Sequence, residues 1–293
     1  MFRARRLGPA AGHGGRNVAS GGGVPRAPGS RGEAALKILL VADLHYALPQ
    51  FDWVLAEARH YDAVVIAGDL LDVGAIASPD AQIVAVLAYL ERLANEVAVV
   101  VCSGNHDLDR RVEGENVAAW LEEARALRIC TDGAAVALGD TLISACPWWD
   151  GPRTKAAIAR QLERDAARLA SEGLARWIWA YHAPPDASPL SWGGARHHGD
   201  ADLRRWIERH GPDIVCSGHV HNAPFVPGGA WADRVGATWC FNMGQQIGPV
   251  PSHIAIETDL GEALWFSIEG GQWRRLGPPH GPPETLRKAP AWF

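Results

Sequence analysis

Residues 97–109 read VAVVVCSGNHDLD, and this stretch contains the pattern that decides the fold. Its first five residues are apolar, which is typical of a buried parallel strand, and turn-forming residues follow directly. Gly104 allows a sharp turn where the strand ends. Asn105, His106 and Asp107 are then expected at the carboxyl edge of the sheet, where open α/β sheets bind ligands. We therefore take this stretch as the centre of the chemistry.

The other predicted strands of this kind also end in residues that bind metals or act as acids and bases. Asp43 and His45 follow the strand at 37–41, Asp69 and Asp72 follow 63–67, His182 follows 177–181, and His219 and His221 follow 213–217. One Asp-x-His pair alone fits an ordinary turn. Independent turns, however, would scatter polar residues over both edges of a sheet, whereas these fall at the carboxyl edge each time. Because five of the twelve histidines lie in these blocks, the recurrence predicts a single composite site.

Helical and hairpin patterns separate these strands. The predicted helices are residues 52–60, a helix that Ser78 caps, 117–127, 155–169 and a helix from Asp200 to Gly211, and the further strands are 134–138, 141–145, 237–243, 253–257 and 262–268. Successive strand–helix–strand units imply parallel pairing with right-handed crossovers. The sequence therefore predicts a leader at 1–36, an α/β domain at 37–276 and a proline-rich tail at 277–293.

Length and composition limit the class of protein. At 293 residues and 31.5 kDa, one large α/β domain is favoured over two small ones. The chain has no run of eighteen apolar residues and no secretory cleavage pattern, so we predict no membrane span and a cytoplasmic location. Its five cysteines are widely spaced and lie mostly in apolar runs, which is typical of reduced core thiols rather than of disulfides or a zinc site.

The charge is distributed unevenly along the chain. Residues 1–36 contain six arginines, one glutamate and few large apolar side chains, a composition that predicts a disordered leader. Their net charge of +5 and the chain total of −5 leave −10 for residues 37–293. Such an acidic body argues against an extended nucleic-acid-binding surface, which needs a basic face to displace counterions.

The ordered blocks resemble the calcineurin-like metallophosphoesterase family over about residues 37–268. The matching blocks are Asp-x-His, Gly-Asp-x-x-Asp, Gly-Asn-His-Asp, a histidine followed by prolines, and Gly-His-x-His. The resemblance implies the metallo-dependent phosphatase-like fold, in which two mixed β-sheets form a sandwich flanked by helices. It also implies two divalent metal ions, one held by Asp43, His45, Asp69 and His221 and the other by Asp69, Asn105, His182 and His219.

The same resemblance leaves His106 free near the substrate, as a catalytic residue. Asp72 and Asp107 match motif positions too, and we expect them to orient a ligand or the His106 ring, since metal-bound and catalytic imidazoles need a carboxylate or carbonyl behind them. Their expected role is therefore support rather than coordination.

The residue types themselves agree with metal chemistry. Mixed imidazole and oxygen donors suit Mn, Fe, Zn or Co better than Ca or Mg, and a shared carboxylate sets two such ions about 3.5 to 4 Å apart. A metal-bridging hydroxide can then attack phosphorus in line. We predict a binuclear phosphoesterase, with phosphodiester hydrolysis of a small or nucleotide substrate as first choice. Phosphomonoesterase, nucleotide pyrophosphatase and nuclease activities remain alternatives, and a non-catalytic scaffold on this fold would be expected to have lost ligands.

Several residues near the predicted site are open to two interpretations. Trp148, Trp149, Trp192 and Trp239 either border the site, where indole faces stack on bases, or pack within the sandwich. Arg196, His197 and His198 either contact phosphate or are solvated. The segment FNMGQQ at 241–246 departs from the Asn-Pro-Gly-Ser common near this place in the family, so the subfamily stays undetermined.

Overall fold

The computed structural model describes residues 35–293, so the predicted leader lies outside the described residues except for its last two positions. Leu36 is buried. Its backbone N–H donates to Thr258 Oγ1 (2.9 Å), and Thr258 N–H donates to the Leu36 carbonyl (3.0 Å). Leu36, the residue before the first strand, is therefore already hydrogen-bonded to the C-terminal part of the sheet.

The first sheet has seven strands in the order β15-β14-β13-β12-β1-β2-β3. Their bounds are β1 Lys37–Val41, β2 Ala63–Ala67, β3 Ala98–Cys102, β12 His253–Glu257, β13 Glu262–Ser267, β14 Gly270–Arg275 and β15 Glu284–Thr285. Strands β1, β2 and β3 pair in parallel, as the sequence predicts. The four C-terminal strands add on antiparallel, so the sheet is mixed.

The second sheet has six strands in the order β10-β11-β9-β8-β7-β6. Their bounds are β6 Ala135–Leu138, β7 Thr141–Ala145, β8 Arg176–Ala180, β9 Ile214–Ser217, β10 Ala232–Val235 and β11 Thr238–Asn242. The four inner strands are parallel, and β6 and β10 pair antiparallel at the edges. A separate hairpin consists of β4 Arg110–Val112 and β5 Glu115–Val117.

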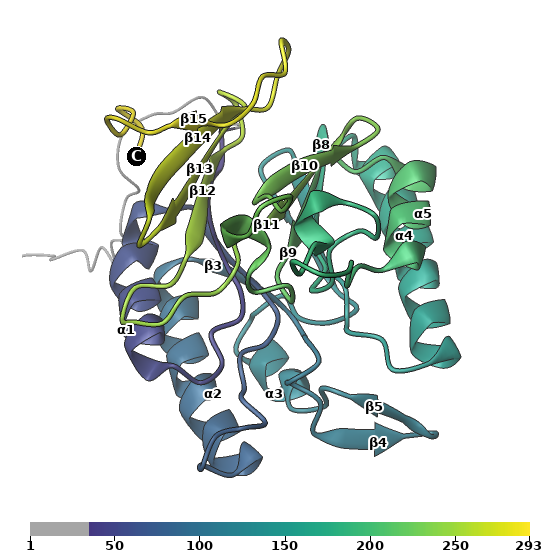
Figure 1. Cartoon of the computed structure of the whole chain (residues 1–293). Helices are drawn as coiled ribbons and strands as arrows, with labels where there is room; N and C mark the ends of the chain where they lie inside the picture. The colour runs from purple at the N-terminus through teal and green to yellow at the C-terminus, as the bar shows by residue number, and fades with distance from the viewer. Residues whose placement is uncertain (1–34) are drawn as a thin grey trace, which may run out of the picture. The chain divides into compact units, whose positions relative to one another are not determined.

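The two sheets form a sandwich with helices on both outer faces (Figure 1). Alternate strand residues such as Ile38, Leu40 and Ile178 form a core between the sheets, because successive side chains of a strand point to opposite faces. The outer faces are covered by α1 Leu48–Glu57, α2 Pro79–Glu96 and α3 Leu121–Ala126 on the first sheet and by α4 Pro152–Glu172 and α5 Ala201–His210 on the second. Short 3₁₀ turns occur at Ala58–His60, Pro189–Ser191 and Ala223–Phe225.

Most predicted elements agree with the structure, and the differences have identifiable causes. The first helix begins at Leu48 rather than at 52, because a proline occupies its first turn. The helix predicted over 117–127 is wrong at its start, since β5 extends to Val117 and the helix covers only Leu121–Ala126. The hairpin β4–β5 was not expected, because its sequence RRVEGENV lacks the apolar alternation that identifies strands.

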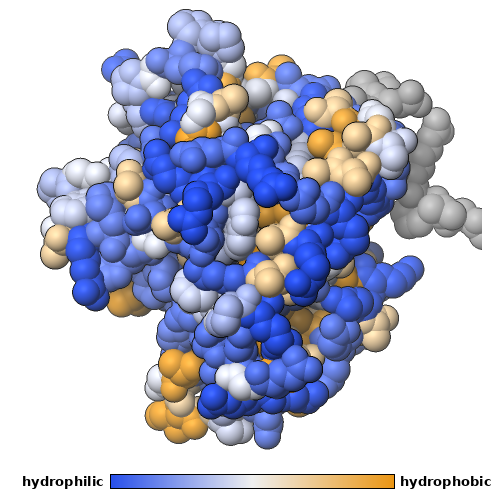
Figure 2. Space-filling model, turned by 90° about the vertical axis from the view of Figure 1, so that its right-hand side faces the viewer, coloured by the Kyte–Doolittle hydropathy of each residue, from blue (hydrophilic) through white to orange (hydrophobic). Residues whose placement is uncertain are grey.

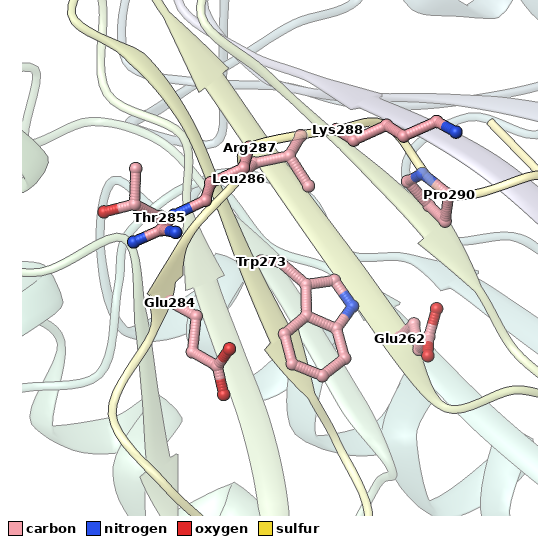
Figure 3. A pocket seen from close by; sticks show the side chains of 8 residues that line it. All are labelled: Glu262, Trp273, Glu284, Thr285, Leu286, Arg287, Lys288 and Pro290. Carbon is pink, nitrogen blue, oxygen red and sulfur yellow. The ribbon is translucent and has the colours of Figure 1, made fainter.

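The proline-rich tail packs on the first sheet. The Trp292 indole N–H donates to Glu262 Oε2 (2.8 Å), and the Phe293 ring stacks on Phe266 with centroids 4.8 Å apart. A cavity of about 780 Å³ lies beside the tail, where Trp273 is flanked by Glu262 and Glu284 (Figure 3). None of the residues that line this cavity belongs to the polar blocks at the strand ends. Among the described residues, no helix combines the length and apolar character needed to cross a bilayer.

Candidate metal centre

The polar blocks that follow β1, β2, β3, β8 and β9 meet at one edge of the sandwich. In the first group, Asp43, His45, Asp69 and His221 each place one ligand-type atom within 4.8 Å of the others. His221 Nε2 lies 3.3 Å from Asp43 Oδ1, and His45 Nε2 lies 3.1 Å from His221 Nε2 and 3.7 Å from Asp69 Oδ2. Donor atoms from both sheets therefore converge on one small volume.

A second group adjoins the first through Asp69. His182 Nε2 lies 3.1 Å from Asp69 Oδ2, and His219 Nδ1 lies 2.9 Å from the Asn105 side-chain oxygen. The His182 and His219 rings are edge to face with centroids 5.3 Å apart. The structure thus brings together the seven residues that are expected as metal ligands, with Asp69 between the two groups.

The His182 ring shows that this arrangement fits a cation. Its Nδ1 lies 2.7 Å from the Ala67 carbonyl oxygen, which fixes the proton on Nδ1. Its Nε2 is buried and has no hydrogen-bond partner within residues 35–293, although it points at Asp69 and Asp43. A buried lone pair aimed at carboxylates, with a carbonyl behind the ring, is the arrangement of a metal-ligating histidine.

Four of these residues adopt a left-handed backbone conformation, which is uncommon outside glycine. The φ angles are 53° at Asp43, 42° at His45, 53° at Asp69 and 67° at His219. Each such position costs roughly 1 kcal/mol or more, and strain of this kind gathers at functional sites. The turns therefore hold these side chains in place at the expense of stability.

Glycine is required where the carboxylates pack directly on the backbone. A Cβ atom at Gly104 would collide with the Asp69 carboxylate, and one at Gly218 would collide with the Asp43 carboxylate. Both glycines belong to the motifs that also supply Asn105 and His219. Their role is close approach, which only glycine permits.

The pKa values of His182 and Asp69, which lie next to each other, are shifted in opposite directions. Burial disfavours the charged form of His182, but the Asp69 carboxylate beside it raises the pKa of His182 to about 9. Burial also opposes ionisation of Asp69, yet His182 holds the pKa of that carboxyl below its usual range. Burial lowers the pKa of His219 to about 4. The buried Asp69 carboxylate therefore favours a positive charge beside it. That charge is either a proton on His182 Nε2 or a cation in the same place.

Asp107 supports the site through the backbone. Its buried carboxylate accepts the amide N–H groups of Asp69, Leu70, Leu71 and Gly104 at 2.8–2.9 Å. Burial, together with the charge of Asp69, raises the pKa of Asp107, while the four N–H groups stabilise its charged form. The carboxylate therefore fixes the loop that carries Asp69.

His106 lies beside the first group without joining the second. Its ring is edge to face with His45 at 4.5 Å. Its Nδ1 lies 3.9 Å from Asp72 Oδ1 and accepts the Val73 backbone N–H at 3.4 Å. The ring is held from the Nδ1 side, with Asp72 next to it but beyond hydrogen-bond distance.

Two residues at the site have contacts that the sequence patterns did not specify. Gln245 donates from its backbone N–H to the His221 carbonyl (2.9 Å) and from Nε2 to the Asp43 carbonyl (3.2 Å). The Trp148 ring lies 5.2 Å from His219 and 5.6 Å from His182. The sequence marks both: Trp148 is one of the tryptophans expected either to border the site or to pack within the sandwich, and Gln245 lies in the segment 241–246. Each follows a strand, at 141–145 and 238–242.

The other tryptophans and the 196–198 segment were expected either to border the site or to have no role in it, and the structure gives a different answer for each. Trp239 is buried in the sandwich core, and its indole N–H donates to the Leu276 carbonyl (2.7 Å). Arg196 is exposed in a loop in which Trp192 packs on His197 at 5.1 Å. The Asn222 side chain, next to His221, donates to the Gly193 carbonyl of that loop (3.1 Å). Trp239 is therefore structural, whereas the 192–198 loop adjoins the site.

A sequence model of the calcineurin-like phosphoesterases matches residues 36–223, which include every block described above. This chain belongs to the calcineurin-like phosphoesterase family. Membership supports a metal-dependent phosphoester hydrolase, and the family generally uses a binuclear divalent metal centre. No curated protein sequence shows significant similarity to this phosphoesterase.

Solved structures share the fold of this phosphoesterase at low sequence identity. The protein TT1561 of Thermus thermophilus is 14% identical with a TM-score of 0.53, and the match covers 83% of this chain and 100% of that one. Purple acid phosphatase PPD1 from seeds of yellow lupin (Lupinus luteus) is 15% identical with a TM-score of 0.52, over 86% of this chain and 53% of that one. These likenesses show the sandwich of mixed sheets flanked by helices and nothing further.

Proposed function

We propose that this chain is a binuclear metal-dependent phosphodiesterase acting on a small or nucleotide substrate, with residues 37–276 as its catalytic domain. The position of Asp69 carries the proposal: its Oδ2 lies 3.1 Å from His182 Nε2 and 3.7 Å from His45 Nε2. One carboxylate therefore faces a ligand group on each side. That is the arrangement expected of a residue shared by two cations.

Each side of Asp69 offers a complete set of ligands. On one side Asp43, His45 and His221 would hold a cation with Asp69, and on the other side Asn105, His182 and His219 would hold a second. The donor set of imidazole, carboxylate and amide oxygen suits Mn, Fe, Zn or Co. When bound, two divalent ions would acidify a water molecule and offset the charge that develops on the phosphoryl oxygens.

His106 is placed to act on the substrate rather than on a cation. Because Val73 N–H donates to Nδ1, the neutral ring carries its proton on Nε2, away from that contact. An Nε2–H group beside the first ligand group can donate to a phosphoryl oxygen or to the leaving alkoxide. A hydrogen bond donated to an oxygen on which charge develops contributes about a hundredfold or more in rate.

The charges of the site favour a singly charged diester over a doubly charged monoester. Within the described residues, the ion pairs of Asp43 and Asp69 are all with histidines, and no arginine or lysine joins them. With two aspartates against two divalent ions, the centre carries a modest positive charge. Arginine binds phosphate groups bidentately and lysine binds them as a point charge, and among the described residues neither is available beside these aspartates for the second charge of a monoester.

Metal analysis coupled to a substrate panel tests this proposal. The panel consists of bis-p-nitrophenyl phosphate, p-nitrophenyl phosphate, a cyclic nucleotide and single-stranded DNA, each with and without chelator. We expect two metal ions per chain and chelator-sensitive turnover, fastest with a diester of low molecular weight. Faster turnover of p-nitrophenyl phosphate would replace the diesterase with a monoesterase. Bound metal without any hydrolysis would point instead to a non-catalytic scaffold.

A further inference from the structure

Large apolar side chains are exposed on two loops beside the metal centre. In residues 72–78, between β2 and α2, Val73 is 70% exposed and Ile76 is fully exposed. In residues 243–252, between β11 and β12, Ile247 is 97% exposed. The face seen in Figure 2 is mainly hydrophilic, with apolar side chains in a few separate patches.

The first of these loops is held in shape by a buried glutamine. Gln82 of α2 accepts the Asp72 N–H at 2.8 Å and donates to the carbonyls of Asp72 and Ala77 at 2.9 Å. Both ends of the 72–78 loop are therefore fixed to α2. Val73 and Ile76 face solvent from a loop whose ends are anchored, so their exposure is a built feature rather than the result of a loose segment.

A second buried glutamine holds the other loop in the same way. Gln50 of α1 donates to the carbonyls of Gln246 (2.9 Å) and Gly248 (3.0 Å), on either side of Ile247. The Gln246 side chain in turn donates to the Val250 carbonyl (2.7 Å) and accepts the Ile268 N–H (2.8 Å). Ile268, itself 78% exposed, thus lies beside the same loop.

Both loops are joined to residues of the metal centre. Val73 N–H donates to the His106 ring, and Gln245 donates to the carbonyls of His221 and Asp43. His106 and His221 both adjoin His45, with ring centroids 4.5 and 4.9 Å from it. Hydrogen bonds therefore join the two loops to the metal centre, one loop at its His106 side and the other at its His221 side.

We propose that these loops bind the apolar chain of an amphiphilic phosphoester, whose phosphoryl group enters the metal centre. The inference rests on the proposed function, because it assigns the substrate class of the same site. Burial of exposed isoleucines is favourable only when something apolar covers them. An alkyl chain attached to the phosphoryl group would be covered by these side chains, since the two loops border the centre at its His106 and His221 sides.

The test compares p-nitrophenyl methyl phosphate with p-nitrophenyl decyl phosphate, both below the micellar concentration, by release of nitrophenolate. We expect the wild-type protein to hydrolyse the decyl ester with a kcat/KM at least about tenfold higher. In the double variant Ile76→Ser, Ile247→Ser this ratio should fall to within about twofold of one. The matched control is Leu260→Ser, an exposed residue on the β12–β13 turn at the opposite end of the sheet, which should keep the wild-type ratio.

The outcomes separate this inference from the proposed function. Equal hydrolysis of both esters by the wild-type protein would overturn the inference and leave the phosphodiesterase intact. No hydrolysis of either ester would mean that the phosphodiesterase itself is wrong. Sedimentation with neutral phosphatidylcholine vesicles, lost in the double variant but without any chain-length preference, would also overturn it, because the loops would then bind a lipid surface rather than the substrate.

Discussion

The two ends of the parallel strands form tight turns from different residues. At the amino ends, four left-handed positions with φ near 60° are glycines, at Gly139, Gly173, Gly211 and Gly261, and one is Arg128. At the carboxyl ends of β1, β2 and β9, equivalent angles occur at Asp43, His45, Asp69 and His219. Glycine adopts this conformation without steric cost, whereas the other residues do not. At the carboxyl edge, aspartate and histidine therefore occupy backbone positions at which glycine would make the protein more stable.

Charge is treated differently at the two ends as well. At the amino end Arg176 pairs with Asp140 and with Asp259 at 2.8 Å, and all three side chains are partly exposed. At the carboxyl end Asp43, Asp69 and Asp107 are buried, and none of them pairs with an arginine or lysine among the described residues. Buried carboxylates without an arginine or lysine partner are expensive in free energy unless a histidine cation or a metal ion joins them. The difference indicates that the carboxyl edge is built for a ligand.

The same substitution at both ends gives the largest expected contrast. Asp69→Asn removes the charge shared by the two ligand groups, and we expect at least about a thousandfold loss of turnover together with loss of bound metal. Asp259→Asn removes a carboxylate from an exposed ion pair at the other end, so turnover should change by less than about twofold. Steady-state rates and metal content per chain measure both. Similar losses in the two variants would refute the assignment of the carboxyl edge.

Stability distinguishes the buried from the exposed carboxylate within the carboxyl edge. Asp107→Asn replaces an acceptor of four amide N–H groups by one with a single oxygen, leaving buried donors unsatisfied, and should lower the free energy of unfolding by about 3 kcal/mol or more. Asp72, which is 33% exposed, provides the control, and Asp72→Asn should cost less than about 1 kcal/mol. Urea denaturation compares them. An equal cost in both variants would contradict the role given to Asp107.

His106 separates chemistry from metal binding. We expect His106→Ala to keep both metal ions and to lose about a hundredfold in turnover, because the ring is placed beside the ligands without belonging to them. Metal stoichiometry and rate are measured on the same preparation. Unchanged turnover, or loss of a metal ion, would show that this residue has been assigned wrongly.

His253 shows the effect of burial on the pKa of a histidine that has no carboxylate from the described part of the chain beside it. It is buried against Trp53 and Phe266, and burial lowers its pKa to about 4, whereas His182 beside Asp69 has a raised pKa. As the pH falls below about 6.5 the unfolded chain binds this proton first, so stability is complete above about pH 6.5 and is lost toward about pH 4. The wild-type protein should therefore lose about 2 kcal/mol more than His253→Phe between about pH 7 and pH 5. Parallel pH profiles of the unfolding free energy would contradict this.

The sequence was sufficient to predict the part of the fold that positions the site. Short apolar runs followed by Asp, Asn or His mark strand ends directly, and β1, β2 and β12 were predicted with their observed bounds. Strands β10 and β14 were not predicted, because ADRV and GGQWRR show neither an apolar run nor clear alternation. Strand β10 lies at an edge of its sheet, and β14 has only the two-residue strand β15 on its outer side. Such half-covered strands are decided by their pairing partners rather than by their own sequences.

The site was predicted less completely than the fold. The motifs single out the residues whose chemistry is visible in the residue type, and these converge. Gln50, Gln82 and Gln245 each make two or three hydrogen bonds to backbone groups of other segments, and glutamine carries no signal for that role. For Asp107, support was expected, but its contacts with four amide groups of two loops depend on how the strand ends meet.

The most direct test of the account is anomalous diffraction from crystals of the protein loaded with Mn²⁺. The account predicts two anomalous peaks about 3.5 to 4 Å apart, both within coordination distance of Asp69, one beside Asp43, His45 and His221 and the other beside Asn105, His182 and His219. A single peak, or two peaks of which one does not touch Asp69, would contradict the claim that this carboxylate joins two metal ions.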